Sequence, residues 1–275
     1  MVLRVDDVTL DFEGLRALSG VSMSIEPGSL AALVGPNGAG KTCLLNCVGG
    51  FYAPTSGRIV FGDAAIQGLP PHRIAAHGIA RTFQFVELFR GMTVLDNILL
   101  GRHRHMCAGV LAGGLYWGRS RREETAHRRR VEEIVEFLEL ERCRKELVAS
   151  LPFGVQKIVA IGRALAMEPK LLLLDEPSTG MNREEKENLA RFLLRIKHEL
   201  GMTMLWVEHD MELVGDLADT VTVLDFGQRI ASGPPDAVLR DPRVIEAYLG
   251  EEVTEVQAQP PTEDFLEPVT ASEER

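Results

Sequence analysis

The sequence predicts an α/β fold with a mainly parallel sheet core, antiparallel strands near the N-terminus and an inserted α-helical lobe. Three observations lead to this prediction. A glycine-rich turn separates the apolar run at 30–34 from a helical pattern, a second apolar run at 171–175 ends in two carboxylates, and helical spacing dominates 92–150. Short runs of apolar residues are typical of strands buried on both faces, as in parallel sheets.

The first part of the chain is predicted to contain strands around one main helix. LRVDDVTLDF alternates in polarity, as a half-buried strand does, whereas SLAALV is apolar almost throughout. The other expected elements here are a helix in KTCLLNCVGG, a strand in GRIVFG, a short helix in HRIAAHG and an extended segment in IARTFQ.

Residues 92 to about 150 form the expected helical lobe. TVLDNILLGRH has helical spacing, and Thr93 precedes it as an N-cap. A longer amphipathic helix follows from Ser120 to about Leu140, and Val131, Ile134 and Leu138 lie on its apolar face.

After the lobe the α/β pattern resumes with the strand LLLLD. A helix starts at Asn182, with Glu185 three residues later as its capping-box partner, and the strand MTMLWVEH follows. The pattern ends with a hairpin in TVTVLDFGQRIASG and two short helices. We expect one domain over 1–250 and a disordered tail over 251–275, where eight acidic residues stand against one basic residue.

Composition and charge exclude several classes of protein. The formal net charge of −10 argues against a nucleic-acid partner. No apolar run approaches the ~20 residues needed to cross a bilayer, so any work at a membrane would need a partner. The four cysteines form no CxxC pair, and we expect reduced thiols.

A phosphate-binding loop is predicted where the glycine-rich turn meets the helix. GPNGAGKT at 35–42 fits G-x-x-x-x-G-K-[ST] after a buried strand. Glycines let backbone N–H groups surround phosphates, and the helix N-terminus adds partial positive charge. Lys41 would reach the β- and γ-phosphates of a nucleotide, and Thr42 would ligate Mg²⁺. The residues expected to contact nucleotide here are Gly35, Pro36, Asn37, Gly38, Ala39, Gly40, Lys41, Thr42 and Cys43.

The second half of the expected site is LLLLDE at 171–176. An apolar strand delivers Asp175 to its carboxyl end, where open parallel sheets bind ligands. We expect Asp175 to hold Mg²⁺, directly or through water, and Glu176 to orient and polarise the attacking water as a catalytic residue.

The chain resembles the ATP-binding subunit of an ABC transporter over residues 2 to 250. GPNGAGKT and LLLLDEP are similar to its Walker A and Walker B motifs, and STGMN matches its D-loop. RTFQ places Gln84 at the family's Q-loop, LPFGVQK occupies the signature position, and WVEHD places His209 at the switch histidine. Phe12 falls where the family stacks an aromatic ring on adenine.

This resemblance implies roles for three residues that the motifs alone leave open. Gln84 would sense Mg²⁺ and the attacking water and couple both to the helical lobe, or it merely caps a strand. His209 would hydrogen-bond the γ-phosphate as a catalytic residue, or it is a buried structural histidine. Phe12 would stack on adenine, or it packs in the core.

The family's architecture also implies a second cassette. Two cassettes pair head to tail, so Gly154 of one would face the nucleotide of its partner from a helix that begins near Val155. The signature departs from the usual Leu-Ser-Gly-Gly-Gln at Pro152, Phe153 and Val155, so the serine hydroxyl is missing while backbone amides and the helix end remain. Asn182 likewise stands where the D-loop usually has aspartate.

The Leu-Pro-aromatic-Gly signature resembles that of the branched-chain amino acid importers. This implies an ATPase at the cytoplasmic face of the membrane, paired with a second cassette as homodimer or heterodimer. Its partners would be permease subunits and, indirectly, a substrate-binding protein, and the segment after Gln84, including Phe89, would face the permease. The alternative is a soluble ABC-type ATPase or a nucleotide-dependent regulatory module.

Overall fold

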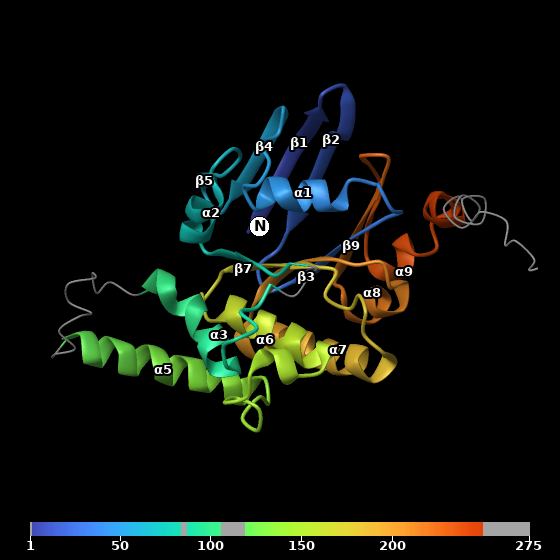
Figure 1. Cartoon of the computed structure of the whole chain (residues 1–275). Helices are drawn as coiled ribbons and strands as arrows, with labels where there is room; N and C mark the ends of the chain where they lie inside the picture. Colours follow the sequence, from blue (N-terminus) through green and yellow to red (C-terminus); the bar gives the residue numbers. More distant parts are fainter. Residues whose placement is uncertain (1, 84–86, 106–118, 250–275) are drawn as a thin grey trace, which may run out of the picture.

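The structure, a computed structural model, describes residues 2–83, 87–105 and 119–249. Within these ranges the strands form two sheets with helix α1 (Lys41–Val48) between them, and a layer of helices covers the far side of the larger sheet (Figure 1). The α/β class with a mainly parallel core and antiparallel N-terminal strands is confirmed.

The larger sheet has the strand order β10-β9-β3-β8-β7-β6. Only β10 runs antiparallel to its neighbour. Its strands are β3 (Leu30–Val34), β6 (Ile79–Arg81), β7 (Leu171–Asp175), β8 (Thr203–Val207), β9 (Thr220–Asp225) and β10 (Gln228–Gly233). Because β3 and β7 are both neighbours of β8, the segment after β3 and the carboxylates at the end of β7 lie at the same edge of the sheet.

The smaller sheet is antiparallel, with the order β2-β1-β4-β5. Its strands are β1 (Leu3–Phe12), β2 (Leu15–Ile25), β4 (Ser56–Phe61) and β5 (Ala64–Ala65). The alternation expected for residues 3–12 is present, since Leu3, Val5, Val8 and Leu10 are buried. The β1–β2 turn brings Phe12 to the end of the sheet that lies nearest the glycine-rich loop.

Strand β3 is apolar throughout because each of its faces belongs to a different core. Leu30, Ala32 and Val34 pack against the helical layer, whereas Ala31 and Leu33 pack against α1 and the smaller sheet. Successive side chains of a strand point to opposite faces, so a strand between two layers has no polar side.

The helix expected to start at Asn182 is present. Asn182 and Glu185 form the expected capping box of α7, with the Asn182 side chain accepting from the Glu185 N–H at 2.9 Å. The helices outside the lobe include α2 (Pro71–His77), α6 (Phe153–Leu165), α7 (Arg183–Leu200), α8 (Met211–Leu217), α9 (Pro235–Val238) and a helix over 242–249.

Helix α6 begins at Phe153, two residues before the expected start near Val155. Pro152 is its N-cap, with φ −53° and ψ 150°, so the chain enters the helix directly after the proline. A proline needs no intrahelical N–H bond at this position. Gly154 therefore lies inside the first turn.

The stretch expected to form a lobe is helical in most of its described part, and residues 138–147 form turns. It contains α3 (Val94–Leu100), the 3-10 helices η1 (Gly101–His105) and η2 (Val148–Ser150), and α5 (Arg119–Phe137). The Thr93 side chain caps α3 by accepting from the Asp96 N–H, as expected. Boundaries of the lobe at about 92 and 150 stay a prediction, and the tail at 251–275 lies outside the described residues.

None of the helices in the described ranges combines the length and the apolar character that a membrane crossing requires.

Candidate functional site

The loop between β3 and α1 has the backbone of a tight phosphate-binding turn. Gly35 and Gly40 have φ of 146° and 97°, a region that favours glycine. A Cβ at Gly35 would overlap the backbone oxygen of Leu224, and one at Gly40 would lie 2.8 Å from the Ala17 oxygen. Glycine at these two positions therefore lets the loop close against neighbouring strands.

The Lys41 ammonium lies inside this loop. Its side chain is buried and donates to the carbonyl oxygens of Gly35 at 2.6 Å and Pro36 at 2.9 Å. Both oxygens belong to the turn that leads to the helix, so the ammonium stays at the centre of the loop. From there, phosphate oxygens would replace the two carbonyls as its acceptors.

A hollow of about 490 Å³ brings the loop together with Phe12 and Glu176. Such a volume lies in the usual range for small-molecule sites. Phe12 is 39% exposed at its wall and meets Tyr52 edge-on with 5.1 Å between ring centroids. This exposure does not fit the alternative that Phe12 packs in the core. The residues from the loop that line the hollow are Asn37, Gly38, Ala39, Gly40, Lys41, Thr42 and Cys43.

Glu176 follows β7 in a strained backbone conformation. Its φ is 43°, which is uncommon for a residue with a side chain and is found disproportionately at functional sites. The Thr179 hydroxyl donates to its carboxylate at 3.2 Å, and the Nδ1 of His209 lies 3.9 Å from the same oxygen. His209 is half exposed, which contradicts the alternative of a buried structural histidine.

Asp175 is paired with an arginine that the sequence analysis did not single out. Arg81 Nη2 donates to the Asp175 carboxylate at 2.7 Å, and both side chains are nearly buried. The second arm of the guanidinium donates to the Asn46 side-chain oxygen on α1 at 2.6 Å. The only available signal was an arginine at the end of a short apolar strand, and the strand order that places β6 beside β7 is not visible in the sequence.

A buried carboxylate holds the turn that carries His209. Glu208 is fully buried and accepts from the Trp206 indole N–H at 3.1 Å and from the His209 backbone N–H at 3.0 Å. It therefore links the Trp206 side chain to the backbone that follows the strand. Sequence reasoning missed Glu208, although a glutamate closing an apolar strand needs buried hydrogen-bond partners.

Lys157 on α6 lies near the carboxylates of Asp175, Glu176 and Glu208. Its ammonium lies 3.5 Å from the Glu176 carbonyl oxygen and 5.4 Å from the Phe153 ring centroid. Burial lowers the pKa of Lys157, and the charges of Glu208, Glu176 and Asp175 act in the opposite direction. The helix that starts at the signature thus contacts the end of β7 in its own chain.

Gly154 lies apart from the nucleotide hollow. Its N–H donates to the Glu185 carboxylate at 3.1 Å, while the other oxygen of Glu185 accepts from the Asn182 N–H at 3.0 Å. A Cβ at Gly154 would lie 2.6 Å from that carboxylate. One glutamate therefore ties the signature turn to the D-loop, a link that sequence reasoning also missed.

We expect Glu185→Ala to lower the free energy of unfolding by about 1–2 kcal/mol, because both the capping box and the acceptor for the Gly154 N–H are lost. Urea unfolding followed by circular dichroism measures this loss. Glu185→Gln keeps a side-chain acceptor and should retain at least half of that stability. Equal losses in the two variants would contradict the assignment.

The remaining expected site residues have simple outcomes. Gln84 lies outside the described residues, so its role as a sensor of magnesium and water stays a prediction. Cys43 lines the hollow, and burial raises its pKa. Burial also raises the pKa of Cys47 to about 12, so this thiol stays protonated at neutral pH.

The donors present fit a magnesium ion that binds together with phosphates. Mg²⁺ prefers oxygen ligands and usually takes one or two carboxylates plus substrate phosphates. The exposed Thr42 and the Asp175 carboxylate offer such oxygens. Across the residues that the structure describes, no cluster of three or more His, Cys, Asp or Glu side chains is suited to hold a metal alone.

A glycine-rich loop lies between a buried parallel strand and a helix, and two carboxylates follow a second strand at the same edge of the sheet; together they define a P-loop nucleotide-binding protein. The family described as "ABC transporter" matches residues 18–179, more than half of the chain. A second family, described as "Branched-chain amino acid ATP-binding cassette transporter", matches residues 228–254.

Curated relatives match along nearly their whole length. The high-affinity branched-chain amino acid transport ATP-binding protein BraF of Pseudomonas aeruginosa is 38% identical over 250 residues, which is 91% of this chain and 98% of BraF. LivG of Escherichia coli K12, which carries the same description, is 37% identical with the same coverage. The probable LivG of Archaeoglobus fulgidus is 33% identical and covers 93% of this chain and 98% of its own.

Solved structures of ATP-binding cassettes have a similar fold. The ADP conformation of MJ1267, an ATP-binding cassette of an ABC transporter, has a TM-score of 0.80 at 33% identity and covers 91% of this chain and 99% of that one. A nucleotide-free cassette from an ABC transporter has a TM-score of 0.78 at the same identity, with coverages of 90% and 98%. The chain belongs to the ABC transporter family, as an ATP-binding cassette that hydrolyses ATP.

Proposed function

We propose that this cassette drives the import of branched-chain or closely related amino acids from the cytoplasmic face of the membrane. The observation that carries the proposal is the match to branched-chain amino acid transport subunits over nearly their full length. The separate match at residues 228–254 to a family described by the same cargo supports it. Permease subunits and a substrate-binding protein would choose the cargo, since this chain supplies the nucleotide site.

In this proposal the glycine-rich loop and α1 hold the nucleotide phosphates. Backbone N–H groups and the helix end point positive charge at them, and the Lys41 ammonium exchanges its two carbonyl acceptors for phosphate oxygens. Phe12 forms the wall of the same hollow and would stack on the adenine ring.

Thr42 and Asp175 would hold Mg²⁺, and Gln84 would join them. When bound, the metal neutralises charge that develops on the phosphate oxygens. Asp175 is close to the phosphate loop because β7 and β3 flank the same strand, β8.

Glu176 would accept the proton of the attacking water, and His209 would orient that water or the γ-phosphate. The two side chains already approach within 3.9 Å, and the Thr179 hydroxyl and the Glu208 carboxylate fix the segments that carry them. A carboxylate in this position acts by positioned proton transfer, the usual contribution of a general base.

Gly154 would complete the nucleotide site of a second cassette. It lies in the first turn of α6, outside the hollow of its own chain, and its N–H would exchange the Glu185 carboxylate for a phosphate oxygen held by the partner cassette. The missing serine hydroxyl at Pro152 leaves backbone N–H groups as the donors of this signature. Both a homodimer and a heterodimer satisfy this geometry.

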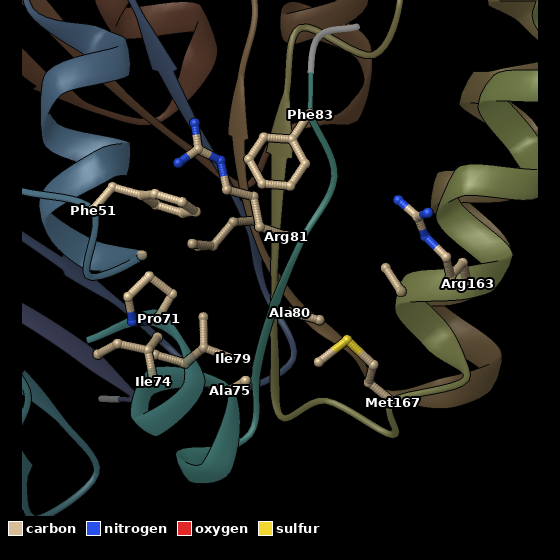
Figure 2. A pocket seen from close by; sticks show the side chains of 13 residues that line it. Phe51, Pro71, Ile74, Ala75, Ile79, Ala80, Arg81, Phe83, Arg163 and Met167 are labelled. Carbon is tan, nitrogen blue, oxygen red and sulfur yellow. The ribbon is translucent and has the colours of Figure 1, made fainter. Parts of the chain in front are cut away.

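A second hollow suits the permease. It measures about 270 Å³ and lies between the P-loop side of the fold and α6, with Phe51, Ile74 and Phe83 on one side and Arg163 and Met167 on the other (Figure 2). We call it the groove. Its lining is largely apolar, and its two arginines, Arg81 and Arg163, favour an occupant that brings carbonyl or carboxylate oxygens.

The groove is tied to the segment expected to face the permease. Arg163 Nη1 donates to the Glu87 carbonyl oxygen at 2.6 Å, and the buried Asn97 side chain holds both the N–H and the carbonyl of Phe89. The Phe89 ring is 56% exposed beside this anchor. A cytoplasmic segment of the permease would therefore contact Phe89 and fill the groove.

Reconstitution tests the function directly. Proteoliposomes that contain the cassette with its cognate permease subunits, supplied with the cognate binding protein, should take up radiolabelled leucine, isoleucine or valine only with ATP on the cassette side. Liposomes with Glu176→Gln cassette are the control for ATP-driven uptake. ATP turnover without uptake of any of these amino acids would refute the cargo, and failure to bind the permease would favour the soluble ATPase alternative.

A further inference from the structure

The Arg81 side chain joins the groove to the nucleotide site. It lines the groove together with Phe51 and Phe83, and its guanidinium carbon lies 5.3 Å and 5.0 Å from the centroids of these two rings. Figure 2 shows the side chain beside the two rings, across from Arg163 and Met167. The same guanidinium donates to Asp175 at 2.7 Å, so one planar group contacts both sites.

The contact with Asp175 occupies an expected magnesium ligand. Arg81 and Asp175 are only 9% and 7% exposed, so the carboxylate has little access to water as an alternative partner. A hydrogen bond between two charged groups at this length is among the strong ones in proteins. Magnesium can use Asp175 fully only if this carboxylate exchanges some of its bonding to the guanidinium for bonding to the metal.

The position of the guanidinium depends on the groove. Contacts with two aromatic rings that meet edge-on, and a two-armed contact with Asn46 and Asp175, fix the position of the group. Within the described residues its Nε–H is buried without a hydrogen-bond partner. Buried donors of this kind are rare in native structures, and an acceptor on a docked segment that displaces the rings would satisfy it.

We propose that Arg81 is a positioning residue that couples the groove to the nucleotide site, holding the Asp175 carboxylate while the groove is empty and loosening that hold when a permease segment fills it. The proposal rests on the proposed function for the identity of the occupant. The Arg81–Asp175 link itself does not depend on it. Loss of Arg81 would free Asp175 for magnesium and weaken the effect of the permease on ATP turnover.

The test compares the isolated cassette with the assembled transporter. Binding of a fluorescent, non-hydrolysable ATP analogue is titrated with MgCl₂ for the wild type, Arg81→Met and Arg102→Met. Arg102, in η1, is the matched control. It is also buried, and its guanidinium pairs with the Glu168 carboxylate at 2.9 Å. We expect binding of the analogue to Arg81→Met to reach half-saturation at a magnesium concentration about tenfold lower than for the wild type. In this variant Asp175 has no charge-assisted bond to an arginine that it must give up before it can bind the metal. Arg102→Met should stay within about twofold of the wild type, because it leaves that bond intact.

ATP turnover then reports the coupling. The permease should stimulate wild-type and Arg102→Met cassettes to the same extent and Arg81→Met much less. Arg81→Lys keeps the charge but has no planar fork to stack and bridge, so it should bind magnesium like the wild type and still lose at least half of the stimulation. Arg81→Lys also serves if Arg81→Met does not fold.

Two results would overturn the proposal. One is an unchanged or higher magnesium requirement in a folded Arg81→Met cassette, and the other is full stimulation of Arg81→Lys by the permease. A wild-type cassette that the permease neither binds nor stimulates would instead refute the proposed function, and the magnesium titration of the isolated cassette would still decide whether Arg81 holds Asp175.

Discussion

A Glu176→Gln cassette should bind ATP with wild-type affinity, remain as a closed dimer and hydrolyse ATP at least about 100-fold more slowly, because the amide cannot take the proton of the attacking water. Glutamine has nearly the same size and shape as glutamate. It also keeps an oxygen that can accept from the Thr179 hydroxyl, now at 3.2 Å from the carboxylate, so the strained turn at Glu176 should persist.

Two measurements check this expectation. Single-turnover hydrolysis gives the rate, and gel filtration with Mg²⁺ and ATP shows whether the dimer accumulates, with cognate cassette added if the pair is a heterodimer. Glu187→Gln is a matched control, since Glu187 is an exposed glutamate on α7 that pairs with Arg183. Hydrolysis by Glu176→Gln at the rate of Glu187→Gln would remove Glu176 from its catalytic role.

The parts of this site that the sequence predicts are those in which local pattern and local chemistry agree. Strand β3, the glycine turn and α1 are contiguous in sequence, so their arrangement follows from adjacent residues. The same is true of the Thr93 cap and of the Asn182–Glu185 capping box. Each of these depends on hydrogen bonds that span three residues, which a linear motif can specify.

The contacts that the sequence did not predict are long-range and involve charged groups. Arg81 and Asp175 are 94 residues apart and meet only because β6 and β7 are neighbouring parallel strands. Lys157 approaches the end of β7 because α6 packs across the sheet. The hydrophobic periodicity of a sequence does not predict such a contact between a helix and a strand end. No local rule predicts that the Glu185 carboxylate accepts a hydrogen bond from the Gly154 N–H in the first turn of α6 as well as capping its own helix.

These unpredicted contacts share one consequence. The signature helix contacts the end of β7 through Lys157 and the D-loop through Glu185, and the groove contacts Asp175 through Arg81. Linear motifs identify the groups that are expected to touch nucleotide. The tertiary contacts connect those groups to the surfaces where a second cassette and a permease would bind, so the coupling of hydrolysis to transport has to be sought in them.

Lys41→Ala should reduce the affinity for ATP by roughly 10- to 100-fold, because a hydrogen bond to a charged group contributes about 1.5–3 kcal/mol and each 1.4 kcal/mol is a factor of ten. The affinity for ATP falls for a second reason, which is present before nucleotide binds. The Lys41 ammonium bonds to the Gly35 and Pro36 oxygens, so its removal also loosens the loop before any phosphate arrives.

Thermal unfolding with and without nucleotide separates these two causes. A ligand stabilises the folded state in proportion to the logarithm of its concentration over Kd, so at fixed ATP the upward shift in Tm should shrink strongly in Lys41→Ala. The Tm without ATP should fall as well, because the carbonyls of Gly35 and Pro36 lose their donor. Lys145→Ala, which removes an exposed lysine between α5 and η2, should leave both values unchanged. An ATP-induced shift of wild-type size in Lys41→Ala would contradict the assignment of this loop to phosphate binding.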